Sequence, residues 1–258
     1  MHINQSILVP LCAFALPLSL ALASPAVMGQ TTANAAITNV KVQVIDLTPD
    51  DGIWPWVWVV NNVDWAPTAS STMVQIPAGF QQQDGWLGTS LGAALASGGA
   101  SASASTGASD FSGTGGGSAS ASAQAEAGTA SWSVAQLFDG EFFAGAGTQV
   151  VVTADVHGLA ANAQGGSAMA LASLGISAVD GSGFDSSQAW VFDSPYFVDA
   201  SMPSTLTVRW DNFSDSAATG RLLVDVSAQA ISVPEPAPAA MLAVAALLGL
   251  ATRRRRAG

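Results

Sequence analysis

Alternation of apolar and polar residues is the main structural signal in the middle of the chain. From Ile37 to Leu47 apolar side chains recur at every second or third position, which predicts a strand with one face toward a core. Turn-forming sequences rich in Gly, Asp and Pro separate this segment from later ones of the same kind. Alternation predicts further strands over residues 53–60, 131–138, 148–156, 167–179, 188–192, 205–210 and 221–231.

These segments predict the fold class of the region 36–232. No long stretch between the two ends of the chain has the apolar period and caps of a helix. About ten short strands separated by turns are typical of an all-β domain. We therefore predict an antiparallel β-sandwich, with a jelly roll as one variant.

Gly, Ala and Ser dominate residues 85–130, a composition that is typical of a flexible linker. Within this segment, however, residues 100–105 and 118–123 alternate Ala and Ser with strict period two. Two strands with this pattern would place Ala on one face and Ser on the other. The favoured interpretation is a pair of small-residue strands, and disorder is the alternative.

The N-terminal end resembles a secretory signal in its apolar pattern. Residues 7–23 are largely apolar, and a small-x-small cleavage motif ends at Ala23, with a second one ending at Ala35. We predict a signal peptide over residues 1–23, with cleavage as late as 35, and hence the Sec machinery and signal peptidase as partners. An uncleaved membrane helix is the alternative, because no Lys or Arg precedes the apolar run.

The C-terminal end combines an uncharged apolar run with four adjacent arginines. Residues 239–252 contain no charge, and Arg253, Arg254, Arg255 and Arg256 follow them. A helix over this run reaches about 21 Å, whereas a hydrocarbon core is roughly 30 Å thick. We predict a short, marginal transmembrane helix, with the arginines in the cytoplasm and the preceding chain outside.

A proline-rich motif precedes this helix. Val233 is followed by Pro234, Glu235 and Pro236, and the two prolines favour an extended, accessible segment. The order of motif, short apolar helix and arginine cluster over 233–258 resembles the PEP-CTERM sorting signal of Gram-negative bacteria.

This resemblance implies processing by a membrane-embedded exosortase, which recognises Pro234, Glu235 and Pro236 and removes the tail in organisms that secrete exopolysaccharide. An ordinary tail anchor behind a Pro-rich linker is the alternative. Residues 46–55 also resemble, more loosely, a segment of PEP-CTERM cargo ectodomains, and that likeness implies no active site.

Charge and cysteine usage narrow the classes of partner. The net charge is −11, and the region before Pro234 carries 17 acidic residues against only Lys41, Arg209 and Arg221. Nucleic acid is therefore not an expected partner, since phosphate binding needs clustered cations. The single cysteine, Cys12, lies in the predicted signal peptide, so the mature protein would have no disulfide or thiol nucleophile.

Two features raise the question of catalysis. Ser90 lies in a G-x-S-x-G pattern, which marks a hydrolase only at a strand-turn-helix corner with a histidine later in the chain. His157 is the only histidine outside the signal segment, and we expect it at a strand end or turn. We predict no enzymatic activity and no cofactor, although paired carboxylates for glycoside hydrolysis remain an alternative.

Three aspartates, Asp46, Asp50 and Asp51, form a weak candidate calcium site because carboxylate oxygens are the ligands that calcium prefers. Their spacing differs from that of an EF-hand, and Asp in a turn containing Pro and Gly needs no metal to explain it.

Alternate tryptophans at Trp54, Trp56 and Trp58 share one face of the predicted strand 53–60. Buried rings would anchor the core, which is the favoured interpretation. Exposed rings would form a platform for stacking sugars. The sequence thus predicts an exported cell-surface or extracellular protein, anchored in the inner membrane before processing, with a non-catalytic structural role. A carbohydrate-binding module of the exopolysaccharide matrix is the alternative.

Overall fold

The computed structural model describes residues 29–59, 69–86, 90–107, 116–180 and 182–233. The chain divides into two units, and all of these residues belong to the unit Gly29–Val233. The predicted signal peptide over residues 1–23 and, apart from Val233, the predicted sorting signal with its arginines lie outside the described residues.

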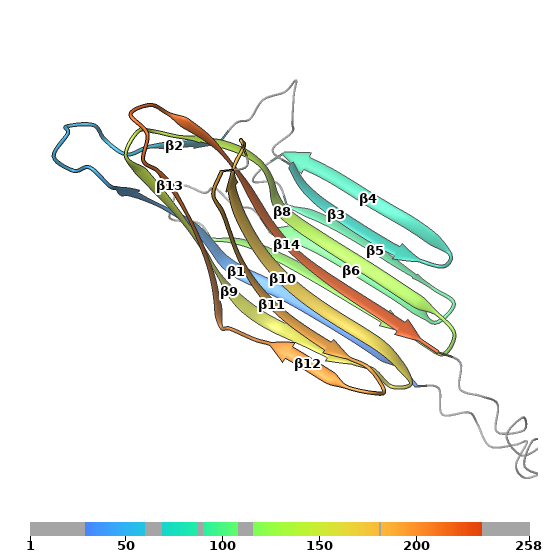
Figure 1. Cartoon of the computed structure of the whole chain (residues 1–258). Helices are drawn as coiled ribbons and strands as arrows, with labels where there is room; N and C mark the ends of the chain where they lie inside the picture. The colour runs from blue at the N-terminus through green and yellow to red at the C-terminus, as the bar shows by residue number, and fades with distance from the viewer. Residues whose placement is uncertain (1–28, 60–68, 87–89, 108–115, 181, 234–258) are drawn as a thin grey trace, which may run out of the picture. The chain divides into compact units, whose positions relative to one another are not determined.

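The described residues form an all-β fold without helices, which confirms the predicted class (Figure 1). All strand pairs in it are antiparallel. The strands are Thr31–Asp46 (β1), Val57–Val59 (β2), Ala69–Ile76 (β3), Gly79–Trp86 (β4), Leu91–Ser97 (β5), Ala100–Gly107 (β6), Gly117–Ala125 (β7), Ala130–Ala144 (β8), Thr148–Asn162 (β9), Gly166–Ala178 (β10), Phe184–Asp193 (β11), Val198–Ser201 (β12), Thr205–Asn212 (β13) and Ala218–Ser232 (β14).

Two sheets contain these strands. The six-stranded sheet has the order β13-β9-β1-β7-β6-β5, and the eight-stranded sheet has the order β12-β11-β10-β14-β8-β3-β4, with β2 paired to β8. Strands far apart in sequence are neighbours in both sheets, as in the pairs β1–β9 and β14–β8. Buried side chains of both sheets belong to a single hydrophobic cluster.

The small-residue strands predicted within residues 85–130 are confirmed. Strands β6 and β7 pair in a register that places Ala104 opposite Ala121 and Ser103 opposite Ser122. The alanines are buried and Ser103 is exposed, as the period of two requires.

The alanine-rich part of the core is thin. Ser131 and Ser133 on β8 are buried, and their hydroxyls donate to the carbonyl oxygens of Gln124 and Ser122 on β7, at 2.8 and 2.9 Å. A serine side chain reaches the backbone of the other sheet only if the two sheets lie close together. Ala123 lies between the two acceptor residues and is 1% exposed, so small side chains on β7 permit this approach.

Larger side chains fill the opposite end of the core. Phe138 is fully buried, and the rings of Phe142 and Trp210 meet edge to face at a centroid distance of 5.4 Å. Phe142 comes from β8 and Trp210 from β13, so this contact joins the two sheets near the loops that carry the candidate site.

Candidate binding surface

The three alternate tryptophans are exposed, so the favoured prediction that they anchor the core is wrong. Trp54 is 86% exposed, Trp58 71% and Trp56 43%. Only Val57–Val59 forms a strand, and Pro55 lies outside it because proline cannot donate to a ladder.

The two valines that alternate with Trp58, Val57 and Val59, explain which face is buried. Val57 and Val59 pack against the core and line a small apolar cavity with Val42, Phe142 and Leu222. A period of two identifies the residues that share a face, but the complementary surface decides which face turns inward. Here the smaller valines of β2, which is paired beside β8, fill space between the two sheets, and the tryptophan side faces away from the core.

A hydrogen-bonded turn precedes the tryptophan segment. The backbone N–H of Thr48 donates to Asp46 Oδ1 at 2.9 Å, and the Thr48 hydroxyl donates to Asp51 Oδ2 at 2.6 Å. Asp51 Oδ1 accepts from the N–H of Ile53 at 2.7 Å. The hydrogen bond from the Thr48 hydroxyl, and to a lesser extent that from the Ile53 N–H, lowers the pKa of Asp51 below its ordinary value.

These contacts give Asp46 and Asp51 a role in the turn that needs no calcium ion. Asp46, Asp50 and Asp51 do not form a group that could hold a metal ion, and the described residues contain no other such group of three. Asp46 and Asp51 instead order the turn that leads to Trp54, which is the alternative reading of a Pro-Gly turn.

The turn between β8 and β9 contacts the segment that carries the tryptophans. The N–H of Gly145 donates to the carbonyl of Trp56 at 2.9 Å, and a Cβ at position 145 would lie 2.6 Å from Trp56 Nε1. Only glycine therefore allows the indole to lie against this turn. The N–H of Leu47 also donates to the carbonyl oxygen of Gly147 at 2.7 Å. This bond joins the start of the β1–β2 loop to the same turn.

Asn212 holds the turn from its other side. Its side chain is buried, and its amide donates to the carbonyls of Gly145 at 2.8 Å, Ala144 at 3.2 Å and Ser216 at 2.9 Å. Its Oδ1 accepts from the Ser214 hydroxyl at 2.7 Å. The β13–β14 loop, the β8–β9 turn and the tryptophan segment are thus joined by direct hydrogen bonds, and they lie at the upper left of Figure 1.

The strand register extends this aromatic surface across the eight-stranded sheet. Trp58 on β2 pairs with Phe143 on β8, and Phe143 pairs with Thr219 on β14. Phe143 is 41% exposed, and Phe184 at the start of β11 is 73% exposed. We call Trp54, Trp56, Trp58 and Phe143 the aromatic platform.

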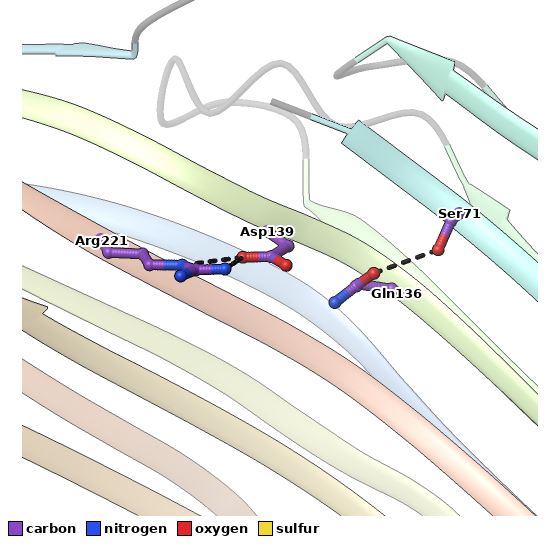
Figure 2. Close-up of polar contacts among 4 residues, drawn as sticks. All are labelled: Ser71, Gln136, Asp139 and Arg221. Carbon is purple, nitrogen blue, oxygen red and sulfur yellow. Dashed lines mark hydrogen bonds and ion pairs between the residues drawn. The ribbon is translucent and has the colours of Figure 1, made fainter. Parts of the chain in front are cut away.

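The outer face of the eight-stranded sheet, to which Phe143 belongs, also carries polar contacts, and Figure 2 shows four of the residues that make them. Arg221 donates from Nε and Nη2 to Asp139 Oδ1 at 3.1 and 2.8 Å. Farther along β8, the Ser71 hydroxyl donates to Gln136 Oε1 at 3.1 Å. Gln136 and Asp139 share this face because a bulge places two buried residues between them.

Asp225 lies on β14 of the same sheet, and its pKa is raised above the ordinary value. Burial raises the pKa of its carboxyl, a hydrogen bond from Ser173 lowers it, and the negative charge of Asp139 raises it further. The net direction is upward, so the neutral form is favoured relative to an exposed aspartate.

The structure places the two residues that raised the question of catalysis, Ser90 and His157, in or beside strands. Ser90 is exposed and directly precedes β5, so a strand follows it where a nucleophile elbow requires a helix. Gly88 and Thr89 lie outside the described residues. His157 is exposed within β9, beside Gly158 at φ +63°, in a stretch where the β1–β9 register shifts. The predicted strand end is therefore a bulge inside a longer strand.

Comparison with protein-family models, curated proteins and solved structures finds no match to this chain. In the part of the chain that the structure describes, no helix has the length and hydropathy of a membrane span. The geometry of the platform is therefore the basis for the functional argument.

Sequence reasoning missed Phe143, Phe184 and Phe213 as exposed aromatic residues. Phe184 follows Gly183, and Phe213 lies between Asn212 and Ser214, so both occur in turn-forming sequence where burial is uncommon. The turn-forming residues around Phe184 and Phe213 were therefore the sequence signal from which their exposure could have been predicted. For Phe143 no such signal exists, because its exposure depends on the pairing of β8 with β2 and β14.

Proposed function

We propose that this chain is an exported, non-catalytic protein of the cell surface or extracellular matrix whose ectodomain binds polysaccharide through the aromatic platform. In this proposal the two sheets form a β-sandwich, flanked by an N-terminal signal helix and a C-terminal transmembrane helix. The carbohydrate-binding role, the alternative at the level of sequence, gains support from the exposure of the tryptophans.

Exposure of Trp54 and Trp58 is the observation that carries the proposal. Indole rings bring large apolar area, and leaving them in water forgoes the stabilisation that burial would provide. Three such rings within five residues are exposed, and a concentration of exposed apolar side chains in a soluble domain marks an interaction site. The flat faces of sugars stack on such rings, and the hydroxyls of sugars can bond to groups such as Arg221 and Asp139.

The supporting framework strengthens this reading. Hydrogen bonds that Asn212 and Gly145 donate, and one that the Asp51 carboxylate accepts from Ile53, hold the segments that carry the rings. A preorganised surface loses less conformational entropy on binding than a mobile loop. The structural role without a ligand offers no comparable reason for three exposed tryptophans.

Delivery rests on the sequence resemblance. We propose that an exosortase recognises Pro234-Glu235-Pro236 and that Arg253–Arg256 stop transfer until the tail is processed. Cells with and without the exosortase, carrying a label within the ectodomain, test this. Replacing the three motif residues by alanine should leave a larger, membrane-retained product, and an unchanged size and location would refute the sorting proposal.

Binding is tested by titrating the purified full chain with a soluble neutral glucan while tryptophan fluorescence is recorded. The wild type should show saturable quenching, and the double variant Trp54→Ala/Trp58→Ala should lose most of it. Tyr196→Ala is the matched control, because Tyr196 is 91% exposed and follows the opposite end of β11 from Phe184. Equal quenching in all three proteins would remove the platform from the proposal.

A further inference from the structure

A groove lies between the β10–β11 turn and the β13–β14 loop, with a volume of about 1300 Å³. Two phenylalanines contribute to its lining, Phe184 and Phe213, which are 73% and 78% exposed. Trp210 also lines the groove, and it is held by its edge-to-face contact with Phe142. The groove therefore offers apolar rings beside a fixed base.

Polar side chains line the same groove in a fixed arrangement. Asp211 Oδ2 lies 3.6 Å from Arg209 Nε, and Asp211 Oδ1 accepts from Gln149 at 2.6 Å. Asp185 accepts from the backbone N–H of Arg209 at 2.7 Å, which satisfies a donor of the edge strand β13. The Arg209 side chain remains 63% exposed, so guanidinium donors face the groove alongside carboxylate acceptors.

The groove adjoins the aromatic platform. Asn212 lines it and also donates to Gly145, against which Trp56 lies. Thr219 also lines the groove. Thr219 on β14 and Trp58 on β2 both pair with Phe143 on β8, so Phe143 is the residue between them across the strands. At about 4.8 Å between neighbouring strands, Thr219 and Trp58 are roughly 10 Å apart along the sheet.

Charge limits the class of ligand. Asp180, Asp185 and Asp211 line the groove against the single cation Arg209, and the ectodomain as a whole is strongly acidic. A polyanion would be repelled both locally and at a distance. A neutral chain with hydroxyl groups can donate to the carboxylates and accept from the guanidinium without that cost.

We infer that the groove binds a segment of a neutral polysaccharide and that one chain of this polymer contacts the groove and the aromatic platform together. The inference rests on the proposed function and deepens it, because it specifies an uncharged ligand and a site longer than the platform. Phe184 and Phe213 stack on sugar rings, and Arg209 with Asp211 bonds to their hydroxyls.

Calorimetric titration of the full chain with neutral gluco-oligosaccharides of increasing length tests this. Affinity should rise with length until the ligand spans platform and groove. Phe213→Ala should lower the affinity for long oligosaccharides by about fivefold and leave short ones nearly unaffected, since one aromatic contact contributes about 1 kcal/mol. Arg209→Gln should have the same length-dependent effect, and it covers the case in which the Phe213 variant folds poorly.

The outcomes separate the inference from the proposed function. If Trp58→Ala weakens binding while both groove variants bind like the wild type at every length, the groove inference is wrong and the platform proposal stands. If wild type and all variants fail to bind, both are wrong. Stronger binding of a uronic acid polymer than of the neutral glucan of equal length would overturn the assignment of an uncharged ligand.

Discussion

Enlarging Ala123 should disrupt the thin part of the core. This side chain is 1% exposed on β7, between the two carbonyls that accept from Ser131 and Ser133 of the other sheet. A leucine there adds three carbons where a serine side chain already spans the distance between sheets. The variant Ala123→Leu must therefore push β8 away from β7 or adopt a strained rotamer.

The magnitude follows from two contributions. Overpacking of a filled core costs typically 1–3 kcal/mol. Loss of the two intersheet hydrogen bonds adds about 1 kcal/mol each. We expect Ala123→Leu to lower the free energy of unfolding by about 3–5 kcal/mol, a large part of the roughly 5–15 kcal/mol available to a domain.

Urea denaturation followed by tryptophan fluorescence measures this change. Ser103→Leu is the matched control, because Ser103 lies on the neighbouring strand β6 and its side chain is exposed. We expect the control to change stability by no more than about 0.5 kcal/mol. A loss below about 1 kcal/mol for Ala123→Leu would refute the reasoning, because the sheets would then have room for a larger side chain.

Three further predictions follow from named contacts. In denaturant titrations, Asn212→Ala should lower the free energy of unfolding by about 2–3 kcal/mol, because the variant leaves the carbonyls of Gly145 and Ala144 without their donor. An unchanged free energy of unfolding would contradict the anchoring role of Asn212. Asp225→Asn should raise the melting temperature at neutral pH. Because the pKa of Asp225 is raised in the folded state, the wild type loses stability as the pH rises past the ordinary Asp range. The gain in melting temperature from Asp225→Asn should therefore vanish near pH 3, where the carboxyl is protonated in both states. An equal gain at neutral pH and at pH 3 would contradict this prediction. Mass spectrometry of the mature N-terminus should show that the signal peptide is cleaved before Thr31, for example after Ala23. The reason is that Ala33 and Ala35 of β1 are buried and pair with Ala123 and Ala121. A mature chain that starts at Ala36 would contradict this prediction, because it would lack the first part of β1.

The sequence predicted the strands whose inward positions hold large or branched side chains. The segments around Val150, Ile176 and Val224 were predicted because apolar and small residues alternate there with strict period. Strands β6 and β7 were also predicted, from the Ala-Ser period alone. The hairpin of β3 and β4 was not predicted, because Gln81, Gln82 and Gln83 obscure any apolar alternation in β4.

The candidate site was predicted only in part. The period of two grouped Trp54, Trp56 and Trp58, and all three are exposed, but it could not determine that Val57 and Val59 would face the core. The groove depends on the approach of the β10–β11 turn to β13, which is a long-range contact such as the bond between Asp185 and Arg209. Nothing in local sequence specifies that contact.

Retention on polysaccharide tests the central claim most directly. The full chain, and its Trp54→Ala/Trp58→Ala and Tyr196→Ala variants, would be mixed with exopolysaccharide isolated from the producing cells, and the fraction that co-sediments would be measured. The platform account predicts that the wild type and the Tyr196 variant co-sediment equally and that the double tryptophan variant stays in solution. Co-sedimentation of the double variant at the level of the wild type would contradict it.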